Sequence, residues 1–196
     1  MHKFKKNAEL NVTDGILYKE NFLPDPSEVF EYLTGNIEWD ERMAVRKTAS
    51  YGVAYNYSQI SYPYQPLLPG LREICLDVRQ VVGFEPNNCL INFYADGTSK
   101  MGFHSDQTDI LEAGTGVVII SLGTTRTLRF RNIQNKDVNV DFDLAPGSLL
   151  YMTQFVQAQW QHAILRSDTD QARISLTLRR IKTNEMANDI TSLPSQ

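Results

Sequence analysis

The sequence predicts a mainly β fold with flanking helices, in the form of a jelly roll. Two observations lead to this prediction. Before residue 88, two segments have helical periodicity. After it, short runs of strand-forming residues are separated by turn residues, and there are enough of these runs to form two facing sheets. The expected strands lie near residues 89–94, 102–105, 117–122, 127–131, 138–143, 148–152, 161–165 and 172–181.

The first part of the chain should contain one strand and two helices. The strand is expected near residues 15–18. Asp25-Pro26 indicates a helix start, because proline is favoured in the first helical turn, and this helix should run to about Thr34 and end at Gly35. The second helix should cover about residues 68–82, and a glycine follows it directly.

The last expected strand has one polar and one apolar face. In Arg173–Arg179, four polar residues alternate with three apolar ones. Asn92 and Tyr94 share a face in the same way. A surface strand with its polar side in water would give the same pattern. Because both strands flank candidate metal ligands, we expect their polar faces to line the interior of a small barrel, which can hold one ligand.

Two of the three histidines stand in a pattern that indicates a metal site, namely His104-Ser105-Asp106 and His162. Residues two apart on a strand point to the same face, so His104 and Asp106 could contact one ion. Two imidazoles and one carboxylate are the ligand set of non-haem Fe(II) oxygenases. Zn²⁺ accepts the same ligands, so a non-catalytic, ligand-binding jelly roll is a second interpretation.

The arginines of the polar strand predict an anionic ligand. A buried charge without a partner is very costly, and a guanidinium binds a carboxylate through two parallel hydrogen bonds. A dicarboxylate co-substrate would supply that anion.

These residues resemble the AlkB family of Fe(II)- and 2-oxoglutarate-dependent dioxygenases, double-stranded β-helix enzymes that oxidatively dealkylate nucleic-acid bases. The similarity runs from about Arg46 to Arg180 and is closest to the branch that repairs duplex DNA. The motifs that carry it are Asn92-Phe93-Tyr94-Ala95-Asp96-Gly97, His104-Ser105-Asp106, Ser121-Leu122-Gly123, Gly147-Ser148-Leu149-Leu150, Trp160-Gln161-His162 and the pair Arg173 and Arg179.

The resemblance implies an iron centre that uses O₂. His104, Asp106 and His162 would be the iron ligands and the catalytic residues.

The resemblance also implies a binding site for 2-oxoglutarate. Asn92 and Tyr94 would bind this co-substrate, and Arg179 would pair with its distal carboxylate. Arg173 would lie near the metal-bound carboxylate and the ligand aspartate. Ser175, also expected in the co-substrate site, stands where the family often has asparagine, a departure that would alter a hydrogen bond at this position.

The segment 46–52 and the two tyrosines after it resemble the substrate lid of the duplex-repair branch. By this likeness Tyr57 would stack on a flipped base and Tyr55 would lie at the rim of the pocket. An equally supported alternative is that the tyrosines pack a hairpin, since aromatic residues favour strands. Arg46 and Arg131 are the expected phosphate contacts, whereas Arg126 is expected to be solvated surface.

Thr108 departs from the family pattern. Repair enzymes of the family often have an acidic residue two positions after the ligand aspartate, and here that position is threonine, followed by Asp109. Either Asp109 takes over the contact with the base, or the base preference differs. Both residues are candidates for substrate binding.

Composition predicts one domain. A chain of 196 residues, 42% hydrophobic, can bury one sizeable core, and we expect a single domain over 1–182 with a support and lid part at 1–87, a jelly-roll core at 88–182 and a flexible tail at 183–196. Two cysteines suggest free thiols, and the chain contains no run of about twenty apolar residues. We therefore expect a monomer in the cytoplasm or nucleus, soluble and not bound to a membrane.

The resulting hypothesis is an oxidoreductase that dealkylates N-methylated bases such as 1-methyladenine or 3-methylcytosine, in DNA more than in RNA. It would release formaldehyde, succinate and CO₂. The net charge of −4 and Thr108 leave a second hypothesis, the same oxidative chemistry on a protein side chain or a small metabolite.

Overall fold

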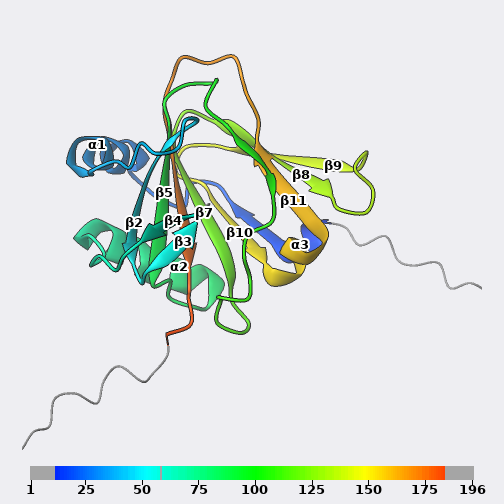
Figure 1. The fold of residues 1–196 in the computed structure, drawn as a ribbon, viewed down its shortest axis with the longest axis horizontal. Helices are drawn as coiled ribbons and strands as arrows, with labels where there is room; N and C mark the ends of the chain where they lie inside the picture. Colours follow the sequence, from blue (N-terminus) through cyan, green and yellow to red (C-terminus); the bar gives the residue numbers. More distant parts are fainter. Residues whose placement is uncertain (1–11, 58, 184–196) are drawn as a thin grey trace, which may run out of the picture.

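The strand runs of the sequence form two antiparallel sheets that face each other (Figure 1). The computed structural model describes residues 12–57 and 59–183. The larger sheet has the order β1 (Ile16–Lys19), β10 (Leu149–Thr153), β7 (Gly116–Gly123), β12 (Arg173–Arg179), β5 (Asn88–Tyr94) and β2 (Lys47–Gly52). The smaller sheet has the order β6 (Met101–His104), β11 (Trp160–Ile164), β8 (Arg126–Asn132) and β9 (Asn139–Leu144). The predicted mainly β jelly roll with flanking helices is confirmed.

Two helices cover the outer face of the larger sheet (Figure 1). They are α1 (Pro26–Asn36) and α2 (Pro69–Val82), and Leu33 and Cys75 are among the buried residues that they contribute. The apolar residues of β12, the alternate positions between Arg173 and Arg179, pack in the same cluster. Because side chains alternate along a strand, the polar residues of β12 must point to the opposite face, toward the smaller sheet.

The space between the two sheets holds a second apolar cluster at one side of the polar residues. Leu128 and Phe130 of the smaller sheet meet Val117 and Leu150 of the larger sheet there. The jelly roll therefore has an apolar layer between its helices and the larger sheet. The space between its two sheets contains both polar and apolar side chains, and a ligand could be held there.

Several local predictions need correction. The first helix does not end at Gly35 but includes it, and it ends before Ile37, which is extended and buried in the core. The glycine after the second helix does end that helix, because Gly83 takes a left-handed conformation with φ of 81°. The elements without a prediction include η1 (Val12–Gly15), β2, β4 (Ile60–Tyr62) and α3 (Gln154–Gln159).

The segment that resembles a lid is partly a sheet edge. β2 pairs along its whole length with β5, the strand that carries Asn92. Beyond it, β3 (Tyr55–Tyr57) and β4 form a two-stranded hairpin. All but the first residue of the predicted tail at 183–196 lies outside the described residues. Within the described residues, no helix is both long and apolar enough to cross a membrane, and Cys75 and Cys89 are buried free thiols.

Candidate active site

His104, Asp106 and His162 meet between the sheets, close enough for one metal ion to contact all three. His104 ends β6 and His162 lies directly opposite it on β11, so their rings are 4.4 Å apart between centroids. Asp106 follows β6 by two residues, and its Oδ2 is 3.5 Å from His162 Nε2. The predicted grouping of these three side chains is confirmed.

The protonation states suit metal binding, which requires neutral histidine and ionised aspartate. Burial alone would raise the pKa of Asp106, but Arg179 and the two histidines outweigh it and hold the pKa at about 2. Burial lowers the pKa of His162 to about 4, although Asp106 acts in the opposite direction. His104 Nδ1 is 2.9 Å from the carbonyl oxygen of Gly102, which can only accept, so Nδ1 donates to it and Nε2 is the ring atom left to face a metal.

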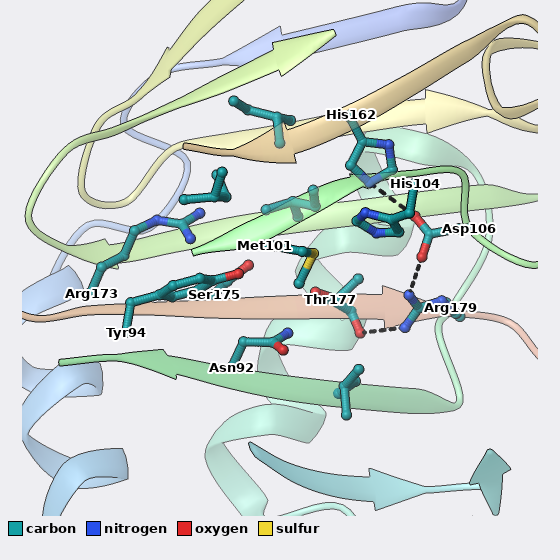
Figure 2. Close-up of a pocket in the computed structure, with 14 residues that line it drawn as sticks. Asn92, Tyr94, Met101, His104, Asp106, His162, Arg173, Ser175, Thr177 and Arg179 are labelled. Carbon is teal, nitrogen blue, oxygen red and sulfur yellow. Dashed lines mark hydrogen bonds and ion pairs between the residues drawn. The ribbon is translucent and has the colours of Figure 1, made fainter. Parts of the chain in front are cut away.

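A pocket runs from the metal ligands along β12 and β5 (Figure 2). It contains about 390 Å³ of space not filled by atoms, part of which is open to solvent. Its polar wall comes from alternate residues of the two strands, and its apolar wall comes from the neighbouring strands. The residues that line it are Leu90, Asn92, Tyr94, Met101, His104, Asp106, Ile119, Leu128, His162, Ile164, Arg173, Ser175, Thr177 and Arg179. The prediction that the polar strand faces line the barrel interior is confirmed.

The two arginines of β12 lie at opposite ends of this pocket (Figure 2). Arg179 is beside the candidate metal site, and its Nη2 donates to Asp106 Oδ1 at 2.5 Å. Arg173 is six residues earlier on the strand, about 20 Å away at the usual rise per residue. The prediction that Arg173 lies near Asp106 is therefore wrong, because the strand direction brings Arg179 to the aspartate instead.

Arg173 carries donors that the described residues do not satisfy. Its side chain is fully buried, and its Nε donates to Ser121 Oγ at 2.9 Å. Its Nη1 and Nη2 are buried and have no hydrogen-bond partner among the described residues. The ring centroid of Tyr94 is 5.2 Å from its guanidinium carbon. A buried cation with two free donors fits one carboxylate of a bound dicarboxylate.

Comparison with known proteins places this site in a family. The sequence profile described as 2OG-Fe(II) oxygenase superfamily matches residues 18–179. The chain belongs to this superfamily. This AlkB-like chain is also similar to DNA oxidative demethylase ALKBH2 of Mus musculus, with 30% identity over 77% of the chain and 70% of the relative. The family uses Fe(II), 2-oxoglutarate and O₂, and the His104, Asp106 and His162 group is its candidate iron site here.

Two further likenesses agree with this family. Alpha-ketoglutarate-dependent dioxygenase alkB homolog 3 of Rattus norvegicus is 28% identical over 81% of the AlkB-like chain and 61% of the relative. The chain thus spans about three fifths of the length of that relative. The solved structure of OsALKBH1 superposes with a TM-score of 0.61 at 17% identity, covering 85% of this chain and 98% of the other, and so supports the jelly-roll fold.

The substrate-side arginines of the AlkB-like chain lie in different surroundings from those expected. Arg46 is 9% exposed, and its Nε donates to Asn92 Oδ1 at 2.9 Å, so it faces the co-substrate wall. Arg131 is half-buried on β8, where its guanidinium lies 3.7 Å from the ring centroid of Phe103 and donates to Gln161. Arg46 therefore contacts the pocket residue Asn92 without lining the pocket itself, and Arg131 also lies outside the pocket lining.

The hairpin tyrosines are only partly described. Tyr55 is 4% exposed and packs with Ile60 and Tyr62, and its ring lies 4.8 Å from the Arg179 guanidinium carbon. Tyr55 thus belongs to a small core that includes other residues of the hairpin, and it contacts the pocket residue Arg179. The side chain of Tyr57 lies outside the described residues.

Thr108 and Asp109 lie in the loop after Asp106 and do not line the pocket. Thr108 is half-buried, and its carbonyl accepts from the Leu111 backbone N–H. Asp109 is exposed, and its carbonyl accepts from Lys182 Nζ at 2.8 Å.

Two more polar residues of the AlkB-like chain belong to the site. Thr177 lines the pocket between Ser175 and Arg179, as the alternation of β12 predicted, although no role was assigned to it. Gln157 on α3 is 4% exposed and bonds to Asp106. No motif marks Gln157, and its helix was not predicted, so the sequence offered no signal for this contact.

Proposed function

We propose that this chain is an Fe(II)- and 2-oxoglutarate-dependent dioxygenase that removes methyl groups from N-methylated bases, in DNA in preference to RNA. The observation that carries the proposal is the charge arrangement of one pocket. A carboxylate and two histidines meet at one end, and a buried guanidinium with two free donors lies at the other. The family match and the likeness to a protein named as a DNA oxidative demethylase support the reaction and the substrate class.

The proposed roles follow from the contacts. His104, Asp106 and His162 would hold the iron, and Arg179 keeps Asp106 ionised and oriented. Arg173 would bind the distal carboxylate of 2-oxoglutarate, in place of Arg179. Asn92, Tyr94 and Ser175 offer polar atoms along the same wall. Bound iron and co-substrate supply the activation of O₂ that oxidises the methyl group of the substrate.

The overall reaction consumes 2-oxoglutarate, O₂ and the methylated base, and yields succinate, CO₂ and a hydroxymethyl base, which releases formaldehyde. The polar wall would orient the co-substrate, while Met101, Leu128 and Ile164 supply apolar lining to the same pocket. A base inside a duplex cannot reach a buried pocket, so it would be flipped out at a cost of about a few kcal/mol. We also propose that residues 1–182 act as one domain and that the protein works as a monomer.

Reconstitution tests the function directly. Metal-free protein is loaded with Fe(II) and 2-oxoglutarate without oxygen, and O₂ is then added with single-stranded DNA, duplex DNA or RNA that contains 1-methyladenine or 3-methylcytosine. We expect formaldehyde and succinate in equal amounts, with DNA the best substrate. Methylated peptides serve as the comparison. Succinate and formaldehyde from peptides alone would refute the nucleic-acid substrate, and no succinate with any substrate would refute the reaction.

A further inference from the structure

A buried amide on the short helix α3 contacts Asp106 at two points. Gln157 Oε1 accepts from the Asp106 backbone N–H at 2.9 Å, and Gln157 Nε2 donates to Asp106 Oδ2 at 3.2 Å. From this geometry we infer that Gln157 is a positioning residue that sets the orientation of the Asp106 carboxylate for metal binding. The inference rests on the metal site of the proposed function but not on its substrate.

The two contacts fix different parts of the aspartate. The bond to the backbone N–H holds the main chain of the loop after β6, and the bond to Oδ2 holds the end of the side chain. Asp106 is outside the regular strands, so the ladder of β6 does not hold it in place. A side chain that binds both backbone and carboxylate restricts the rotation of the carboxylate about its last torsion, which is otherwise broad.

Gln157 and Arg179 hold opposite oxygens of Asp106. Arg179 Nη2 donates to Oδ1 at 2.5 Å, whereas Gln157 donates to Oδ2. Oδ2 is also the oxygen that faces His162 Nε2, at 3.5 Å. Arg179 alone would leave the carboxylate free to turn about the Oδ1 contact, and Gln157 removes that freedom. The pair therefore holds the carboxylate with Oδ2 facing His162.

The position of Gln157 in the chain couples this contact to a second ligand. α3 follows β10 and leads without a break into β11, which carries His162 five residues after Gln157. Gln157 is 4% exposed, so neither of its bonds competes strongly with water. One segment thus supplies a metal ligand and orients another, and hydrogen bonds to ligands of this kind are worth about 10- to 100-fold in metal affinity.

Gln154 on the same helix provides a matched control. Its Nε2 donates to the backbone carbonyls of Glu112 at 3.2 Å and Thr115 at 2.9 Å, and it is half-buried. Gln154→Met and Gln157→Met each remove one glutamine with two hydrogen bonds, keep the charge and keep an unbranched side chain. Only the second change touches a candidate metal ligand. Gln157→Asn keeps an amide that is one methylene too short to reach both atoms.

The test is binding of Co(II) to the metal-free protein, followed by visible absorption, with urea unfolding of each variant in parallel. We expect Gln157→Met and Gln157→Asn to weaken Co(II) binding about 10- to 100-fold, and Gln154→Met to change it by less than about twofold. If Gln157→Met does not fold, the asparagine variant decides.

Co(II) affinities of both Gln157 variants within about twofold of the Gln154→Met protein would overturn the inference, whatever their stabilities. A wild-type protein that binds no Co(II) would overturn the metal site and with it the proposed function. Normal Co(II) binding without any demethylation would leave the role of Gln157 supported and refute only the proposed reaction.

Discussion

Replacing Arg173 with methionine should abolish binding of 2-oxoglutarate and leave the ligand-free fold nearly as stable as before. Arg173 offers two buried donors, Nη1 and Nη2, without partners among the described residues. Hydrogen bonds that involve a charged group contribute about 1.5–3 kcal/mol each. Two such bonds to a carboxylate give about 3–6 kcal/mol, which corresponds to a loss of affinity of about two to four decades.

The effect on the ligand-free protein should be small because two terms oppose each other. Methionine removes the bond from Nε to Ser121 Oγ, worth about 1.5–3 kcal/mol because its donor is charged. It also removes a fully buried cation, whose burial is costly and lowers the pKa of Arg173 to about 10. We expect the free energy of unfolding without 2-oxoglutarate to change by less than about 2 kcal/mol.

Anaerobic thermal unfolding with Mn(II), with and without 2-oxoglutarate, measures both effects. At one hundred times the dissociation constant a ligand stabilises the folded state by about 2.7 kcal/mol, and the Arg173→Met protein should lose this gain. Arg129→Met is the control, because Arg129 is paired with Asp141 on the surface of β8, away from the pocket. If 2-oxoglutarate stabilises the Arg173→Met protein as much as it stabilises the Arg129→Met protein, Arg173 does not bind the co-substrate carboxylate.

Two further predictions concern the candidate metal ligands. Asp106→Ala should abolish Co(II) binding and succinate production while the protein remains folded, and full activity in this variant would refute the ligand set. In metal-free protein, burial lowers the pKa of His162 to about 4, whereas the unfolded histidine takes up a proton below about pH 6.5. The unfolded state thus binds more protons between these values, so the free energy of unfolding should fall as the pH drops from about 6.5 to 4. Urea unfolding of the His162→Gln protein should show a flatter pH dependence, and an unchanged slope would contradict the assignment.

Much of the fold was predictable because period-two patterns report directly on strand faces. The alternation in β12 gave both the strand and the face that lines the pocket, and all eight expected strands after residue 88 are present. The spacing in His104-Ser105-Asp106 likewise predicted the candidate metal site, although Asp106 follows β6 and does not lie on the strand as the prediction assumed.

Contacts across the barrel could not be read from the sequence. Which arginine of β12 reaches Asp106 depends on the direction of the strand past the β6 loop, and the likeness to a family does not contain that geometry. Gln157 was missed for the same reason, since its helix has only six residues and makes its contact with a loop 51 positions away. Arg126 was expected at the surface, yet it is 2% exposed.

Arg126 holds together the loop before β6 and the segment directly after β11. Its Nη1 donates to the Asp96 carbonyl at 3.0 Å, and its Nη2 donates to the carbonyls of Ser99 at 2.9 Å and Leu165 at 2.5 Å. It has no ion-pair partner within 4 Å in the described part of the chain, so these carbonyl dipoles compensate its charge, together with the Tyr94 ring 5.9 Å from its guanidinium carbon. Asp96 and Ser99 belong to the loop that leads into β6, so this arginine also fixes the strand that ends at His104.

Arg126→Met should therefore destabilise the protein more than the loss of an ordinary surface charge. It leaves three carbonyl oxygens without a donor, at about 1–3 kcal/mol each, while removal of a desolvated cation returns part of that loss. We expect the free energy of unfolding of the metal-free protein, measured with urea, to decrease by about 3 kcal/mol or more. Arg129→Met, which breaks an exposed pair, should cost less than about 1 kcal/mol. Arg126→Lys keeps three donors and should recover part of the difference. Equal stabilities of the Arg126→Met and Arg129→Met proteins would mean that the loops before β6 are held by their own backbone bonds, and that His104 owes its position to the ladder between β6 and β11.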